Sequence, residues 1–264
     1  MNAPKHKSSK VKNDKPENQE NIKVYVRIRP LLSTEFGSEV CVETVDDKTC
    51  RVNNGSVIHE GTFDRVYVQG TPQSELFQGI ENNLEAILAG YNSTVFAYGQ
   101  TGSGKTFTMF GSHWESNHPK FKKPRGDING FPNLSDFNNY GIVPRAIQNI
   151  FDMIMEKEYE NETDHQFSVY CSFLQIYNES LFDLLRNTKS QLRIREDPTF
   201  GIFVENLTEY VVQNPSECVA LLRKGERNRA ARSTRGNQFS SRSHTIFQIL
   251  VETNKPNAKG LISR

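Results

Sequence analysis

One eight-residue stretch constrains the fold of this chain more than any other. The stretch is Gly99-Gln100-Thr101-Gly102-Ser103-Gly104-Lys105-Thr106. It has the required residue at every fixed position of the GxxxxGK(S/T) phosphate-binding loop. Lys105 would contact the β- and γ-phosphates, and the Thr106 hydroxyl would ligate Mg²⁺. The alternative is a glycine- and serine-rich turn with a chance lysine, which the complete match disfavours.

The segments on either side of this loop complete the expected setting. Residues 93–98 are a short apolar run that predicts a buried strand, and residues 105–109 predict the start of a helix. The glycines let successive backbone N–H groups point at one oxyanion, and the helix adds its positive dipole end. Strand, glycine-rich turn and helix together indicate a nucleotide site.

Composition excludes several other classes of protein. The chain has 264 residues, of which 36% are hydrophobic, enough for one large domain or two small ones. Lys and Arg number 32 against 31 Asp and Glu, so no overall field favours nucleic acid or a lipid surface. No apolar run approaches the roughly 20 residues of a membrane span, and the basic start lacks the apolar stretch of a signal peptide. We expect a cytoplasmic protein without a nucleic-acid partner.

The cysteines agree with that location. Cys41, Cys50, Cys171 and Cys218 lack CxxC spacing. This pattern indicates buried thiols in a reducing compartment.

The first thirty residues divide into a polar leader and a strand. Residues 1–21 are too polar to offset the entropy of ordering, which predicts a disordered leader. Residues 21–30 alternate apolar and polar side chains, which predicts a strand that Pro30 closes. Arg27, Arg29 and Pro30 would form a flat cationic platform suited to stacking on adenine, although such a cluster is also common on ordinary edge strands.

The remaining pattern alternates strands and helices. We expect strands at 40–45, 49–53, 56–59, 166–177, 192–195, 202–204 and 246–251. One helix is expected to have Thr71 as its N-cap and Pro72 as its first residue, and others begin near Val143 and after an Asn214 capping box. Residues 112–140 follow no apolar period and indicate a loop insertion that is either functional or disordered.

A second polar run leads directly into the strand at 246–251. It includes Asn237, Ser240, Ser241 and Arg242. Its hydroxyl groups would ligate Mg²⁺ or hold the attacking water, and the arginine would complete a charged contact at the γ-phosphate. The alternative is a serine-rich turn held by its own hydrogen bonds.

Taken together, these motifs resemble the N-terminal part of a kinesin motor domain over about residues 22 to 264. The resemblance rests on VYVRIRP at 24–30, TFDRVY at 62–67, AYGQTGSGKT at 97–106, GIVPR at 141–145, SFLQIYNE at 172–179, Asn228-Arg229, and the switch I run at 237–245. It implies an α/β fold of the P-loop NTPase type, in which helices flank a central mixed β-sheet. It also implies an ATPase that moves along microtubules, with ATP and Mg²⁺ as ligands and a cytoskeletal location.

The resemblance assigns roles to individual residues. Arg27, Arg29 and Pro30 would line the adenine pocket, with Phe107 on the other side of the ring. Ser240 and Ser241 would sense the γ-phosphate and the metal, so that Thr106 and Ser241 are the expected Mg²⁺ ligands. Arg242 would pair with a glutamate of switch II, and Asn237 belongs to the same switch I run. The resemblance also implies that the insertion at 112–140 lies next to the nucleotide site.

One expected motif is absent from these 264 residues. Kinesins continue after the switch I strand into Asp-Leu-Ala-Gly-Ser-Glu, the switch II segment, and then into tubulin-binding helices. We therefore expect residues 22–264 to be a partial motor domain that is incomplete at its C-terminus. In the kinesin fold both neighbours of the strand at 94–98 come later in the chain, so we expect this strand to be unpaired here.

Three functions remain open from the sequence. The first is the ATP-binding part of a microtubule motor. The second is a truncated, non-motile fragment that binds nucleotide or tubulin, for which we expect no microtubule-stimulated hydrolysis by residues 1–264. The third is an unrelated P-loop kinase or GTPase, which the absence of a guanine-reading Asn-Lys-x-Asp motif argues against.

Overall fold

The computed structural model describes residues 22–112, 138–160, 167–186, 188, 190–199, 201–232, 243–256 and 262–263. Its contacts divide the chain into two compact units, residues 1–69 and residues 70–264, and each is described by itself. The predicted leader at 1–21, most of the insertion at 112–140 and the polar run at 237–242 lie outside the described residues.

The first unit contains two small sheets. Strand β1 (Tyr25–Arg27) pairs in parallel with β5 (Arg65–Tyr67), and the Ile28 N–H extends this pairing to the Tyr67 carbonyl. The strand predicted at 21–30 is therefore shorter than expected, because its partner β5 offers only three residues. A short 3₁₀ helix, η1 (Ser33–Glu35), follows.

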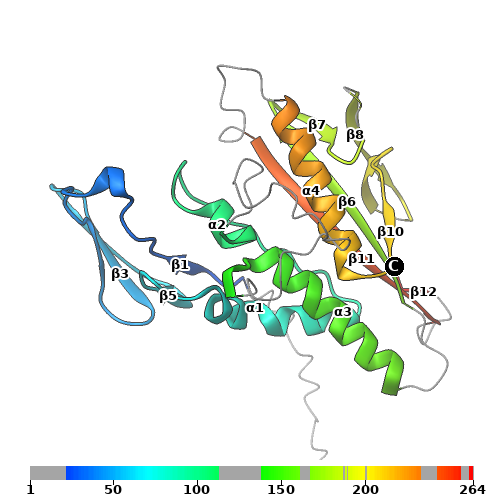
Figure 1. The fold of residues 1–264 in the computed structure, drawn as a ribbon, viewed down its shortest axis with the longest axis horizontal. Helices are drawn as coiled ribbons and strands as arrows, with labels where there is room; N and C mark the ends of the chain where they lie inside the picture. The colour runs from blue at the N-terminus through cyan, green and yellow to red at the C-terminus, as the bar shows by residue number, and fades with distance from the viewer. Residues whose placement is uncertain are drawn as a thin grey trace, which may run out of the picture. The chain divides into compact units, whose positions relative to one another are not determined.

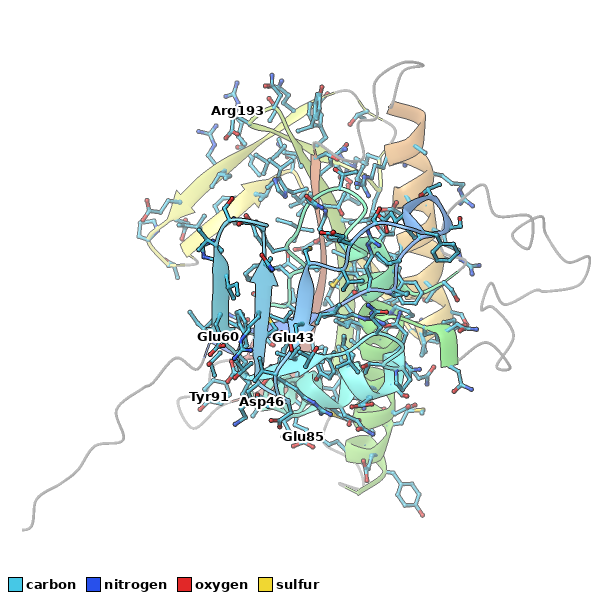
Figure 2. The ribbon with its side chains drawn as sticks, turned by 90° about the vertical axis from the view of Figure 1, so that its left-hand side faces the viewer. Glu43, Asp46, Glu60, Glu85, Tyr91 and Arg193 are labelled. Carbon is cyan, nitrogen blue, oxygen red and sulfur yellow. The ribbon has the colours of Figure 1, made fainter. Side chains whose placement is uncertain are left out.

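The second sheet of this unit is a three-stranded antiparallel meander. It consists of β2 (Val42–Thr44), β3 (Thr49–Asn53) and β4 (Ile58–Thr62). Gly55 adopts φ 87° in the turn between β3 and β4, a conformation that favours glycine. Arg51 lies between Glu43 and Glu60 on neighbouring strands and forms ion pairs with both, and Figure 2 labels the two glutamates.

The second unit is built on a long antiparallel pair. Strand β6 (Phe167–Tyr177) pairs with β11 (Ser243–Pro256) from Tyr177 opposite Ser243 to Phe167 opposite Thr253. The sheet order is β12–β11–β6–β7–β8–β9, with β10 also pairing with β6 (Figure 1). The added strands are β7 (Ser180–Asp183), β8 (Gln191–Asp197), β9 (Gly201–Glu205), β10 (Tyr210–Val212) and β12 (Ile262–Ser263).

The second unit also contains α-helices. They are α1 (Gln73–Leu88), α2 (Lys105–Phe110), α3 (Ile142–Glu160) and α4 (Pro215–Arg232). Helix α1 packs on α3, and α4 packs on β6 (Figure 1). Their shared core includes Ile147 and Ile150 of α3, Cys171 and Phe173 of β6, and Cys218, Val219 and Leu222 of α4. The amphipathic spacing of these helices places their apolar faces in this core.

Helix starts confirm one predicted cap and correct another. The Glu217 N–H donates to Asn214 Oδ1, and Glu217 Oε2 accepts from the Gln213 N–H, so Asn214 caps α4 as predicted. The prediction of Thr71 as the cap of α1 is wrong. Pro72 takes the N-cap position in an extended conformation, and Gln73 is the first helical residue. A proline cannot donate a backbone hydrogen bond, so either position tolerates it and the sequence does not distinguish them.

The cysteines are reduced, but one is not buried. Cys50, Cys171 and Cys218 are buried as predicted, whereas Cys41 is exposed. It precedes β2, an edge strand of the three-stranded sheet. The Cys171 and Cys218 sulfurs lie 3.2 Å apart, and the Cys218 thiol together with burial raises the pKa of Cys171. Within the described part of the chain, no helix is both long and apolar enough to cross a membrane.

Candidate nucleotide site

The phosphate-loop sequence forms a tight turn that opens α2. Gly99, Gly102 and Gly104 have φ values of 151°, 84° and 96°, which residues with a Cβ rarely adopt. A Cβ on Gly99 would also lie 2.5 Å from Ser103 Oγ. Gly104 is the N-cap of α2 in the left-handed conformation, and Lys105 and Thr106 are its first two residues. The predicted turn and helix start are therefore confirmed.

Lys105 is held by the loop itself. Its Nζ donates to the Gly99 carbonyl at 2.6 Å and to the Gln100 carbonyl at 2.8 Å. The ammonium group thus lies over the loop, bound to neutral oxygens that phosphate oxygens can replace. The Thr106 side chain is exposed beside it. A hydroxyl in the first helical turn of a phosphate loop fits a role as a Mg²⁺ ligand.

Helix α2 is anchored at its far end. The Phe107 carbonyl accepts from the Gly111 N–H at 2.8 Å and from Gln73 Nε2 at 2.7 Å. The Phe110 side chain is buried in the core of the second unit. Gln73 belongs to none of the sequence motifs described above. Gln73 lies three and four residues before the apolar Leu76 and Phe77, so it belongs to the buried face of the helix. This spacing was the sequence signal that could have identified it.

Two glycines join α2 to α3. A Cβ on Gly111 would lie 1.9 Å from the Asn139 carbonyl oxygen, and a Cβ on Gly141 would lie 2.5 Å from the Phe110 nitrogen. A bridge between Gly111 and Tyr140 closes the two ends of the predicted insertion at this junction. The two ends of the insertion therefore meet directly after the helix that carries Lys105.

A buried arginine supports the same junction. Arg145 Nε donates to the Tyr140 carbonyl at 2.9 Å, and burial lowers the pKa of this guanidinium. The side chain is 5% exposed. Arg145 thus fixes the segment that enters α3.

The buried strand predicted before the phosphate loop is wrong. Residues 93–98 adopt no strand in the structure, and Phe96 and Tyr98 are 79% and 96% exposed. The expectation that 94–98 would be unpaired is confirmed within the described residues. Strand formation requires a partner backbone, and an apolar sequence cannot supply one by itself.

The adenine-platform candidates belong to the first unit, apart from Phe107. Arg29 forms a two-pronged ion pair with Glu35, with NH1 and NH2 at 2.7 Å and 2.6 Å from the carboxylate oxygens. These bonds, together with the Leu32 N–H, lower the pKa of Glu35 to about 2. Burial lowers the pKa of Arg27, and Pro30 is exposed. Glu35 belongs to none of the sequence motifs described above.

The switch I candidates Asn237, Ser240, Ser241 and Arg242 lie outside the described residues. The strand that follows them is described. Ser243 and His244 begin β11 opposite Tyr177 and Ile176 at the end of β6. The strand that follows the polar run in sequence therefore begins beside the end of β6.

A glycine-rich turn that opens a helix in an α/β unit, with its lysine held over the turn, is the architecture of a P-loop fold. The comparison with protein families is more specific, since a model described as the kinesin motor domain matches residues 9–263. The chain belongs to the kinesin motor domain family.

Individual relatives agree with this assignment. The chain is 39% identical to kinesin-related protein 5 of Dictyostelium discoideum over 237 residues, covering 88% of this chain and 22% of that protein. It is 34% identical to the kinesin-like protein KIF15 of Homo sapiens over 246 residues, covering 91% of this chain and 16% of that protein. The chain thus spans less than a quarter of the length of either relative.

A solved structure supports the fold. A structure described as that of a fast kinesin superposes with a TM-score of 0.76 and 33% identity, covering 92% of this chain and 62% of that chain. The predicted fold class, an α/β P-loop NTPase fold with mixed sheets flanked by helices, is confirmed.

Proposed function

We propose that this chain is the ATP-binding part of a motor that couples ATP hydrolysis to movement along microtubules. The observation that carries the proposal is the phosphate loop, with three glycines in left-handed conformations and Lys105 at the opening of α2. Membership of the kinesin motor domain family supports ATP as the nucleotide and microtubules as the partner. With microtubules as the partner, we propose that the protein acts on the cytoskeleton in the cytoplasm.

The proposed binding step exchanges ligands at Lys105. Its ammonium leaves the Gly99 and Gln100 carbonyls and binds the β- and γ-phosphate oxygens. The N–H groups of the loop then face the phosphates, where the glycine conformations leave the backbone uncovered. Thr106 and Ser241 are the proposed Mg²⁺ ligands, and the ion, when bound, would neutralise charge on the phosphate oxygens.

The adenine base of ATP would be held by flat side chains. Arg29 is oriented by its two bonds to Glu35, which leave the faces of the guanidinium group available for stacking. We propose Arg27, Arg29 and Pro30 for one side of the adenine and Phe107 for the other. The Phe107 side chain is 45% exposed, so its ring is accessible to a ligand.

Hydrolysis would depend on the switch I run. We propose that Asn237, Ser240 and Ser241 orient water and the γ-phosphate, and that Arg242 closes the site through an ion pair. Preorganised donors of this kind stabilise the charge that develops on the transferred phosphoryl group.

The phosphate-loop assignment is tested by Lys105→Ala, with the exposed Lys48→Ala as the matched control. We expect Lys105→Ala to weaken Mg·ATP binding on the order of 100-fold, because charge-assisted hydrogen bonds to phosphate are lost. Calorimetric titration of the purified protein measures this change, and Lys48→Ala should leave it unaltered. Undiminished ATP affinity in Lys105→Ala would show that the loop is not the nucleotide site.

The microtubule partner needs a separate measurement. We expect a polypeptide that joins these 264 residues to the switch II segment and the tubulin-binding helices implied by the resemblance to co-sediment with taxol-stabilised microtubules and to release more on addition of Mg·ATP. Nucleotide binding without any microtubule binding would instead favour a non-motile nucleotide-binding protein.

A further inference from the structure

Helix α2 is too short to hold its own position. It has six residues, and isolated helices below about 12 residues are marginal in water. Lys105 and Thr106 form its first turn, so any shift of α2 moves both phosphate-binding side chains. The contacts that fix α2 therefore decide the geometry of the proposed site.

Gln73 makes one of these contacts. Its side-chain amide reaches from the first turn of α1 to the Phe107 carbonyl of α2, with an Nε2–oxygen distance of 2.7 Å. The residue is only 4% exposed, so water competes little for this hydrogen bond. The carbonyl also accepts from the Gly111 N–H, and the two donors fix its direction.

Helix α1 does not depend on Gln73 for its own placement. The buried Leu76, Phe77, Ile80 and Leu84 hold α1 in the unit through apolar packing. The Asn149 amide of α3 also donates to Glu81 of α1 at 3.3 Å. Gln73 thus extends from a supported helix to a short one, and its loss should affect α2 more than α1.

We propose that Gln73 is a positioning residue for nucleotide binding. It holds α2 so that Lys105 Nζ and the Thr106 hydroxyl face the phosphates and the Phe107 ring faces the base. Gln73 acts through the Phe107 backbone and does not touch the nucleotide. The inference rests on the proposed function, because it assigns Gln73 a role at the same site.

The variant Gln73→Met tests this role. Methionine has nearly the same length and volume as glutamine but lacks the N–H donor. Gln78→Met is the matched control, since Gln78 is exposed on the same helix. Calorimetric titration of the purified protein with Mg·ADP gives both the dissociation constant and the number of sites per chain.

We expect Gln73→Met to raise the dissociation constant about tenfold, a typical cost for one buried hydrogen bond, with an unchanged number of sites. Gln78→Met should match the wild type. A residue that only stabilised the fold would instead lower the number of sites and leave the dissociation constant unchanged. That result, or a wild-type dissociation constant in Gln73→Met, would overturn the proposal.

A second variant covers the case in which Gln73→Met does not fold. Gln73→Asn keeps the amide but is one methylene too short to reach Phe107, and we expect the same rise in dissociation constant. Wild-type affinity in a folded Gln73→Asn variant would overturn the proposal. If the wild-type protein itself bound no nucleotide, the proposed function would fail and this inference with it. If the wild-type protein bound nucleotide and the Gln73 variants bound it equally well, only this inference would fail.

Discussion

The segments before and after the phosphate loop differ in what their backbones require. Residues 105–110 form α2, whose hydrogen bonds connect residues four apart, as from the Thr108 N–H to the Gly104 carbonyl. Residues 93–98 have an equally suitable sequence for a strand, yet they pair with no strand among the described residues. A helix closes its hydrogen bonds locally, whereas a strand depends on a second segment.

The exposure of the side chains also differs between the segments before and after the loop. Phe110, at the end of α2, is 9% exposed, whereas Phe96, in the segment before the loop, is 79% exposed. Both are phenylalanines within a few residues of the loop. Their difference shows that apolar character alone does not bury a side chain, because another element must cover it.

The largest expected effect tests this difference directly. In the chain of residues 1–264, Phe110→Ala should lower the free energy of unfolding by about 3–5 kcal/mol, because it leaves a cavity in the core. Phe96→Ala should change it by no more than about 0.5 kcal/mol, as for other exposed positions. Urea unfolding followed by circular dichroism measures both. Equal losses in the two variants would remove the distinction.

An intermediate effect is expected where α2 meets α3. Gly111→Ala should lower the free energy of unfolding by about 3 kcal/mol, because its Cβ meets the Asn139 carbonyl and its φ of 94° is left-handed. Gly70→Ala is the matched control, with φ 83° and no atom within 4 Å of the new Cβ.

The control should cost only about 1 kcal/mol, from the backbone conformation alone. The same urea titration compares the two glycine variants. If both variants lower the free energy of unfolding equally, the close approach of α2 to the start of α3 does not stabilise the protein.

The smallest expected effect concerns a local contact in the first unit. The Arg29 ion pair lowers the pKa of Glu35 to about 2, below its ordinary value of 4.5. The stabilisation is therefore present above pH 4.5 and is lost as the pH falls toward 2. Glu35→Gln should remove this part of the pH dependence, and Glu39→Gln, at an exposed position, should not.

Thermal melts between pH 5 and pH 2 check this expectation. The difference in melting temperature between wild type and Glu35→Gln should shrink as the pH falls through this window. A difference that stays constant would mean that the Glu35 carboxylate contributes nothing through its charge.

The sequence alone determined the features whose geometry is local. The Gly-x-x-x-x-Gly-Lys-Thr spacing located the phosphate loop, because only glycine readily takes the left-handed conformations found at Gly99 and Gly104. The expected helix starts at Pro72 and near Val143 located α1 and α3, and the capping box at Asn214 marked the start of α4. Each of these signals acts within a few residues.

Tertiary structure alone decided which distant groups meet. Gln73 reaches Phe107 across 34 positions, and Gly111 approaches Asn139 so closely that a side chain would not fit. The exposure of Phe96 was likewise decided by the elements around it. Such contacts depend on how packed elements orient one another, and a chain pattern with a period of two or 3.6 residues carries no information about that orientation.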